Sequence, residues 1–244
     1  MLVHGFAATS AQVWEQTGWV KRLNTAGFST VLVDLPFHEV KYQRPHALTS
    51  SNHYDVRIPL EYGELLEVTE RGMVELIQQL GHPVHLVGFS AGARICWGVA
   101  ARFPESVDSL CVGGLPQENH LPLLAEMLKA HKEVPLSATE QMFTRLLADS
   151  PVQKSALHSF VAHSGDLRFD PMALRPLCPT LVVQGEADSV SGSSQWLIDG
   201  LQDAGTPHKL LLLPQRDHVN ALTSGVFKKA VISWIQQAEA NTLD

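Results

Sequence analysis

The chain has 244 residues, of which 45% are hydrophobic and 18% are charged, so it can bury a large core and is not a disordered chain. Its formal net charge is −7 and its basic residues do not cluster, which argues against nucleic acid and anionic membrane surfaces as partners. No apolar stretch reaches the length of a membrane span.

Short β-branched or leucine-rich runs alternate with longer helical stretches along the chain. Strands are predicted at residues 2–4, 30–34, 84–88, 107–113, 180–185 and 208–213. Helices are predicted at residues 11–26, 65–80, 91–102, 193–204 and 226–238. Most of the strand segments are continuous apolar runs, which is typical of strands covered on both faces. We therefore predict an α/β fold, with a mostly parallel sheet flanked by helices on both faces.

Two segments interrupt this alternation. Residues 35–62 are rich in proline and histidine and are predicted to be irregular. Residues 115–177 contain no convincing strand but three helical stretches, which is more than a plain crossover needs. We expect residues 115–177 to form a helical lid on a core domain made of residues 1–114 and 178–244. An ordinary outer layer of helices is the alternative.

Three widely spaced cysteines, Cys96, Cys111 and Cys178, form neither a disulfide framework nor a zinc pattern. They indicate a reducing compartment, and we expect small buried thiols. The N-terminal residues lack the basic segment and apolar core of a signal peptide. We therefore predict a cytoplasmic protein.

The sequence GFSAG, from Gly88 to Gly92, joins a predicted strand directly to a predicted helix. A sharp turn there lifts the central Ser90 clear of the sheet and brings the residues two positions away close together, which favours glycine. The helix beginning at Ala91 points its N–H groups and its dipole toward an oxygen next to Ser90. Ser90 is therefore a candidate nucleophile. A glycine-rich turn with a serine N-cap is the alternative.

A serine hydroxyl needs a base to take its proton, and the base needs an orienting acid. Asp188 and His218 each follow a predicted strand, so they lie on the same rim of the sheet as Ser90. The chain order serine, aspartate, histidine is the one expected for this architecture. Glu186 and Glu118 are rival acids. The alternatives for Asp188 and His218 are a turn aspartate and a surface histidine.

A negative oxygen formed during attack by Ser90 needs two N–H donors. The amide of Ala91 is one. The loop after the first strand supplies the second, because Gly5 allows a tight turn that lets the N–H of Phe6 face Ser90.

The segments VHGF, VLVDLP, LVGFSAG, VVQGEAD and RDHVNAL occur in the order found in the α/β-hydrolase superfamily, and the chain resembles its lid-bearing serine hydrolases over nearly its whole length. The resemblance implies a triad of Ser90, Asp188 and His218, with Phe6 and Ala91 as oxyanion donors. It also places the lid where that family inserts one. A serine nucleophile argues against the dehalogenase and epoxide hydrolase branches, which use aspartate.

The sequence departs from the family at two places. The family usually has two antiparallel strands before the HG strand, and their absence would leave strand 30–34 as a bare edge that invites pairing. We expect a second copy, as a homodimer, or residues 35–62 to cover this edge. DLPFHE stands where relatives often have DLPGHG, so Phe37 and His38 make that loop bulkier near the pocket. His38, His46 and His53 match no common metal spacing and are expected to face solvent.

These features predict a hydrolase that cleaves an ester, lactone or related acyl bond of a small, partly apolar substrate through an acyl-enzyme on Ser90, without a cofactor or metal. Carbon–carbon bond hydrolysis, acyl transfer and a small-molecule receptor with an intact triad are the alternatives. The lid side chains are expected to contact substrate or to form the lid's own core. The candidate contact residues are Phe37, Leu124, Met127, Met142, Phe143 and Phe160.

Overall fold

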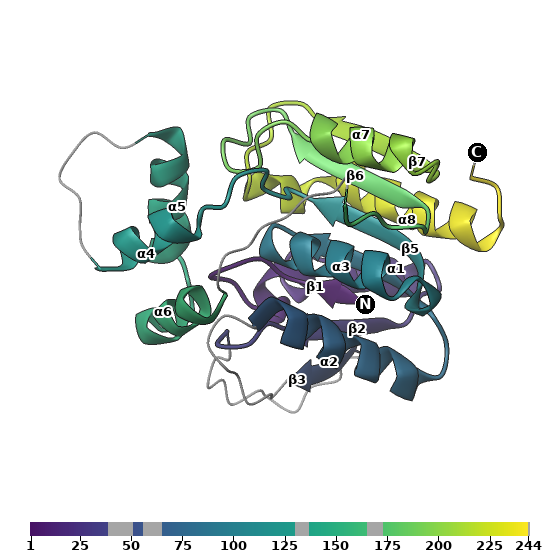
Figure 1. Ribbon diagram of the computed structural model, residues 1–244, viewed down its shortest axis with the longest axis horizontal. Helices are drawn as coiled ribbons and strands as arrows, with labels where there is room; N and C mark the ends of the chain where they lie inside the picture. Colours follow the sequence, from purple (N-terminus) through teal and green to yellow (C-terminus); the bar gives the residue numbers. More distant parts are fainter. Residues whose placement is uncertain (39–50, 56–64, 130–136, 165–172, 244) are drawn as a thin grey trace.

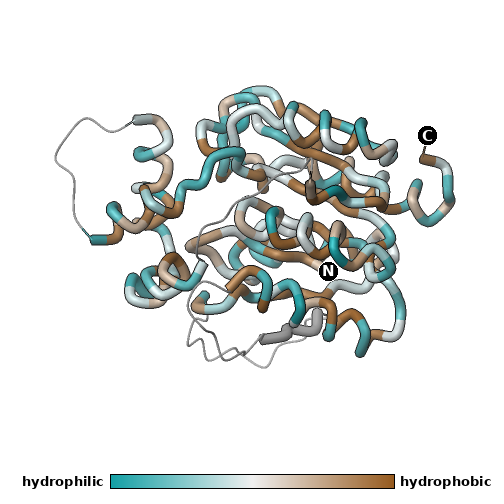
Figure 2. The backbone as a smooth tube through the Cα atoms, viewed as in Figure 1, coloured by the Kyte–Doolittle hydropathy of each residue, from teal (hydrophilic) through white to brown (hydrophobic). Residues whose placement is uncertain are grey.

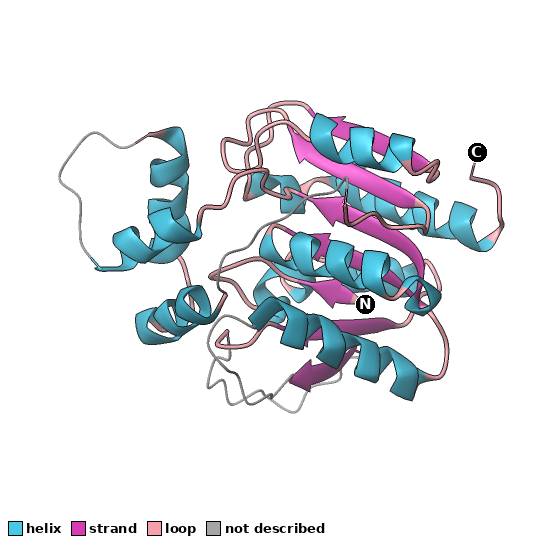
Figure 3. Cartoon of the chain, in the orientation of Figure 1, coloured by secondary structure: helices cyan, strands magenta, loops and turns pink. Residues whose placement is uncertain are grey.

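The computed structural model describes residues 1–38, 65–129, 137–164 and 173–243, and the backbone of residues 51–55. Within these residues a parallel sheet of seven strands has the order β3-β2-β1-β4-β5-β6-β7 (Figure 3). The strands are β1 (Leu2–Val3), β2 (Thr30–Asp34), β3 (Ser51–Asp55), β4 (Val84–Phe89), β5 (Val107–Gly113), β6 (Thr180–Gly185) and β7 (His208–Leu213).

Helices cover both faces of this sheet, as the sequence predicted. In Figure 1, α2, α3 and α7 lie in front of the sheet, while α1 and α8 lie behind it. The helices of these two layers are α1 (Trp19–Thr25), α2 (Leu65–Leu80), α3 (Ala91–Arg102), α7 (Gln195–Asp203) and α8 (Gly225–Glu239).

Neighbouring residues of a central strand belong to different hydrophobic cores. Leu86 of β4 packs in the core that contains α2, α3 and α7, whereas Val87 packs in the core that contains α1 and α8. Val182 and Val183 of β6 divide in the same way. The strands are therefore hydrophobic along their length, and Figure 2 shows this along the middle of the molecule.

Residues 11–26 form two short helices, so the prediction of one continuous helix is wrong. A π-helical turn, Ala11–Glu15, is separated from α1 by Gly18, which has a left-handed φ of 81°. In an uninterrupted α-helix Trp14 and Trp19 would point about 140° apart. The break allows both indole rings to be buried edge to face, with their centroids 5.3 Å apart.

The edge of β2 is covered by the chain's own segment. Residues 51–55 form β3, which pairs in parallel with β2 from Thr30 opposite Ser51 to Asp34 opposite Asp55. This strand corrects the prediction that residues 35–62 are irregular, and it supplies one of the two covers expected for β2. The sequence SNHYD has no apolar run that would have marked it as a strand. A homodimer stays a prediction.

Three helices inserted between β5 and β6 lie beyond the carboxyl ends of the strands (Figure 1). This helical insertion comprises α4 (Leu121–Lys129), α5 (Ala138–Ala148) and α6 (Lys154–His163). The hydroxyl of Thr139 donates a hydrogen bond of 2.7 Å to the carbonyl of Ser189, and the ring of Phe160 lies 5.5 Å from that of Phe6. The insertion thus contacts the loops that follow β6 and β1.

All three cysteines are buried and free. Burial raises the pKa of the Cys96 thiol and of the Cys178 thiol to about 12, so both are un-ionised and unreactive near neutral pH. In the part of the chain that the structure describes, no helix is both long and apolar enough to cross a membrane.

We predict that Phe227→Ala lowers the free energy of unfolding by about 3–5 kcal/mol, because this fully buried ring packs edge to face on Trp19 with centroids 4.9 Å apart. Its neighbour Val226 is 60% exposed, so Val226→Ala should change stability by about 0.5 kcal/mol or less. Urea denaturation of both variants checks this, and equal losses would contradict the assignment of the core.

Candidate active site

Ser90 lies on a strained turn between β4 and α3. Its φ of 55° and ψ of −119° are unusual for a residue with a side chain. A Cβ at Gly88 would lie 2.6 Å from the carbonyl oxygen of Gly92, and a Cβ at Gly92 would overlap the carbonyl oxygens of Val3 and His4. Both glycines are therefore required. For Gly88 the steric reason is the one that the sequence indicated, whereas Gly92 is required by the close approach of β1.

The structure brings the three predicted triad residues together. The Oγ of Ser90 is 3.0 Å from Nε2 of His218, and Nδ1 of His218 is 2.8 Å from Oδ2 of Asp188. His218 is only 2% exposed, and its ring lies 5.2 Å from that of Phe89. The chain of hydrogen bonds therefore runs from a hydroxyl at the rim of the sheet to a buried carboxylate.

The second oxygen of Asp188 accepts hydrogen bonds from the amides of Val190 and Ser191, at 2.9 and 3.0 Å. Burial alone would raise the pKa of Asp188, but the hydrogen bond and charge of His218, with the Ser191 contacts, lower this pKa to about 2. Asp188 is therefore ionised at neutral pH, and it can hold the hydrogen of His218 on Nδ1 so that Nε2 is free to accept.

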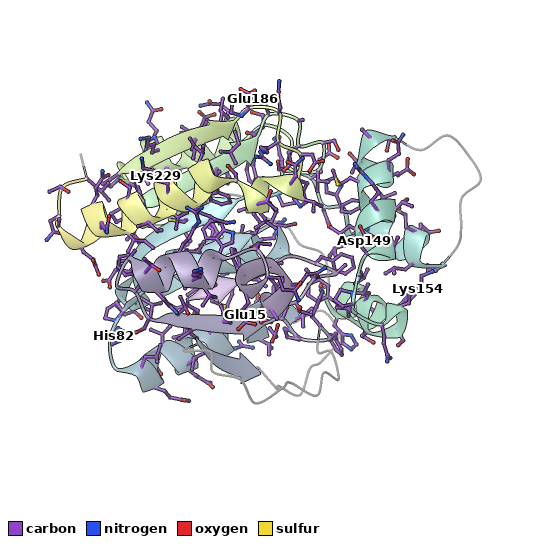
Figure 4. The ribbon with its side chains drawn as sticks, turned by 180° about the vertical axis from the view of Figure 1, so that it is seen from behind. Glu15, His82, Asp149, Lys154, Glu186 and Lys229 are labelled. Carbon is purple, nitrogen blue, oxygen red and sulfur yellow. The ribbon has the colours of Figure 1, made fainter. Side chains whose placement is uncertain are left out.

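The rival acids do not contact His218 in this arrangement. Glu186 is exposed and lies at the outer edge of the molecule in Figure 4. Glu118 is exposed too. The carboxylate of Asp217 instead accepts the amide N–H groups of Val219 and Asn220, so it stabilises the turn that carries His218.

The loop after β1 lies against Ser90. A Cβ at Gly5 would be 3.0 Å from the Cβ of Ser90 and 3.6 Å from its Oγ. Phe6 and Ala91 line the same small cavity as Ser90. Phe6 and Ala91 are thus close to Ser90, and the role of their amides as oxyanion donors stays a prediction.

Two buried histidines join the loop after β1 to the loop after β2. The amide of Ala7 donates to Nε2 of His38, and the amide of Leu35 donates to Nε2 of His4, each at 3.0 Å. Because these nitrogens accept, Nδ1 of each ring carries the hydrogen, which His38 donates to Pro36 O and His4 to Gly5 O, at 2.9 and 2.8 Å. We call this pair the histidine clasp.

The histidine clasp corrects the prediction that His38 faces solvent, because both rings are fully buried. Burial, reinforced by His4, lowers the pKa of His38 to about 3, so the ring stays neutral. The two amide-to-imidazole hydrogen bonds each span 31 residues, so no local sequence pattern indicates the clasp. His46 and the side chain of His53 lie outside the described residues, among which no group of three or more His, Cys, Asp or Glu could hold a metal ion.

Two cavities meet at Ser90. The larger, of about 480 Å³, is lined by Phe6, Ser90, His218 and side chains from α5 and from residues 219–223. The smaller, of about 70 Å³, is lined by Phe6, Ser90, Ala91 and side chains from α4, α5 and α6. Phe6 and Ser90 are common to both linings, so both cavities lie next to Ser90.

Four of the six predicted substrate contacts line these cavities. Met142 lines the larger cavity, whereas Leu124, Phe143 and Phe160 line the smaller one. The same four side chains are buried in the core around α2, α3 and α7, and their contact with a substrate stays a prediction.

Phe37 and Met127 are not among the described residues that line either cavity. The Phe37 ring stacks on His163 of α6, with centroids 5.2 Å apart, and Met127 packs half-buried against the core. The sequence did not indicate Val13 and Leu222, which line the larger cavity.

Residues 1–227 match the model of the alpha/beta hydrolase family. The chain belongs to this family. Among solved structures, this hydrolase-family chain is similar to NosK from Streptomyces actuosus, with 20% identity over 98% of this chain and 97% of that one and a TM-score of 0.64. A thermophilic esterase from Thermogutta terrifontis is also similar, with 17% identity over 97% of this chain and 89% of that chain and a TM-score of 0.63.

A monoacylglycerol lipase from Paleococcus ferrophilus is also similar, with 17% identity over 97% of this chain and 93% of that chain and a TM-score of 0.60. No curated protein matches the sequence. At these identities the structural likeness supports the alpha/beta hydrolase fold alone.

We predict that His38→Gln makes stability less dependent on pH. The folded pKa of His38 is about 3, below its ordinary 6.5, so between these values the unfolded state binds a proton that the folded state does not. Stability therefore falls as pH falls, by about 1.4 kcal/mol per pH unit for one proton. Glutamine offers an acceptor to Ala7 but does not titrate in this range.

Urea denaturation at several pH values from 7 to 4 gives the free energy of unfolding as a function of pH. The slope of this plot should be smaller for His38→Gln than for the unchanged protein. His82→Asn is the control, because His82 is exposed and lies at the end of the molecule opposite the helical insertion (Figure 4). Equal slopes for His38→Gln and the unchanged protein would contradict a neutral, buried His38.

Proposed function

We propose that this protein is a serine hydrolase that cleaves an ester, lactone or related acyl bond of a small, partly apolar substrate. The observation that carries the proposal is the continuous hydrogen-bond chain from Ser90 through His218 to Asp188, with Ser90 opening onto a cavity of about 480 Å³. Family membership and the likeness to a named esterase and a named lipase support it.

Acylation begins when Nε2 of His218 takes the proton of the Ser90 hydroxyl and Oγ forms a bond to the carbonyl carbon. The carbonyl electron pair moves to its oxygen, which the amides of Phe6 and Ala91 stabilise. Each such donor is worth about 2.7–4 kcal/mol. The bond to the leaving oxygen then breaks, and His218 gives its proton to that oxygen, which leaves an acyl-enzyme on Ser90.

Deacylation repeats these steps with water. His218 takes a proton from a water molecule as its oxygen bonds to the acyl carbon, and the bond to Ser90 Oγ then breaks as that proton returns to Oγ. Asp188 stays ionised throughout and stabilises the imidazolium that forms twice in each cycle. The low pKa of Asp188 and the two hydrogen bonds that backbone amides donate to its other oxygen support this role.

The helical insertion acts as the lid in this proposal, with residues 115–177 as lid and residues 1–114 and 178–244 as core domain. Met142 and Leu146 of α5 form part of the wall of the larger cavity. Asp149, at the end of α5, lies where the insertion meets the core (Figure 4). Lid side chains therefore share the cavity with the nucleophile, and they supply apolar contacts to the substrate.

We expect Ser90→Ala to abolish both labelling by a fluorophosphonate probe and release of p-nitrophenol from short-chain esters, because the attacking oxygen is removed. Rates with purified protein and gel fluorescence measure the two outcomes. Ester turnover that persists in Ser90→Ala would rule out this mechanism. Labelling of the unchanged protein without turnover of any ester would favour the receptor alternative.

Asp188→Asn should lower kcat by about 10⁴-fold, because the amide lets His218 adopt the wrong tautomer and no longer stabilises the imidazolium. The matched control is Glu186→Gln, two residues away on the same loop, which should leave turnover unchanged because Glu186 is exposed. Steady-state kinetics at neutral pH compare the two variants. A large loss in Glu186→Gln with none in Asp188→Asn would reverse the assignment of the acid.

A further inference from the structure

We propose that the two cavities divide the substrate between them, the smaller one holding the acyl group and the larger one holding the leaving group. The substrate class is then an ester of a short acyl group with a larger, mainly apolar alcohol. This inference rests on the proposed function and names the substrate class of the same site.

The position of His218 decides which cavity receives the leaving group. When the bond to the leaving oxygen breaks, the proton on Nε2 of His218 must pass to that oxygen, so the leaving group lies on the His218 side of Ser90. His218 lines the larger cavity together with its neighbours Val219 and Asn220. It is not among the described residues that line the smaller cavity.

The remaining substituents of the reacting carbon point elsewhere. In the tetrahedral intermediate this carbon carries Ser90 Oγ, the oxyanion, the leaving oxygen and the acyl chain. The oxyanion turns toward the amides of Phe6 and Ala91, and the leaving oxygen turns toward His218, so the acyl chain takes the direction left over. Ala91 lines the smaller cavity but not the larger one, which places that cavity on the side away from His218.

The size of the smaller cavity favours a short acyl group. Its volume is about 70 Å³, against about 480 Å³ for the larger cavity. The smaller cavity therefore suits the shorter part of the substrate, and the larger cavity suits the longer part. Three walls are core side chains with little freedom to move: Leu124, Phe143 and Phe160 are 4%, 5% and 2% exposed.

Both linings are mainly apolar and include charged residues, such as Arg94 in the smaller cavity and Arg145 in the larger one. Size therefore separates the two cavities more than polarity does. The larger cavity is lined by apolar side chains that suit an apolar alcohol, including Val13, Phe89, Leu146 and Leu222.

Met142 and Phe143 provide a matched pair of variants, because these neighbours on α5 are both buried but line different cavities. The unchanged protein should hydrolyse p-nitrophenyl acetate with a kcat/KM at least about tenfold above that for the octanoate. Phe143→Ala should raise the octanoate-to-acetate ratio by about tenfold, because it lengthens the smaller cavity. Met142→Ala should leave this ratio unchanged and instead alter the ratio of naphthyl acetate to phenyl acetate.

Leu124→Ala is a second enlargement of the smaller cavity, and it should shift the acyl ratio in the same direction if Phe143→Ala does not fold. A preference of the unchanged protein for octanoate would overturn the assignment, as would a shift of the acyl ratio by Met142→Ala but by neither Phe143→Ala nor Leu124→Ala. Hydrolysis of the acetate and the octanoate with equal kcat/KM would overturn this inference but not the proposed function. An absence of both fluorophosphonate labelling and turnover of every ester overturns the proposed function with it.

Discussion

The close approach of the first turn of α3 to the end of β1 is the constraint on which the rest of the site depends. There is no room for a Cβ between Gly92 and the carbonyl oxygens of Val3 and His4, so α3 can pack here only because residue 92 is glycine. The same contact holds Ser90 in its strained conformation and places the loop containing Gly5 within van der Waals distance of it. The proposed nucleophile and one proposed oxyanion donor are therefore positioned by one packing contact, before any substrate binds.

The histidine clasp extends this positioning to the next loop. His4 and His38 each accept an amide hydrogen from the other's loop, so the chain after β1 and the chain after β2 hold each other in place. The ring of His38 also lies edge to face against Phe160 of α6, with centroids 4.8 Å apart. A neutral imidazole suits this role, because it donates and accepts at opposite ends of a flat ring that fits a buried apolar space. The clasp thus connects the helical insertion to the loop that carries the Phe6 amide.

Apolar side chains of the helical insertion are both core residues and cavity walls. Met142, Phe143 and Phe160 belong to a continuous hydrophobic core and at the same time form walls of the cavities at Ser90. A side chain fixed in a core keeps its place when a ligand enters, so it can limit the size of that ligand. The assignment of a small acyl cavity and a large alcohol cavity depends on this rigidity and on the position of His218.

The sequence by itself determined the parallel sheet, most of its strands and the three residues of the proposed triad, because continuous apolar runs, helix-ending glycines and polar residues after strands are local features. The helices 65–80 and 91–102 and the strands 30–34, 107–113, 180–185 and 208–213 match their predicted bounds. Only the tertiary structure decided the strand at Ser51–Asp55, the break at Gly18, the burial of His38 and the two cavities. Each of these depends on contacts between residues far apart in the chain: an edge strand exists through its partner, a helix breaks to bury two indoles, and a cavity is bounded by several elements at once.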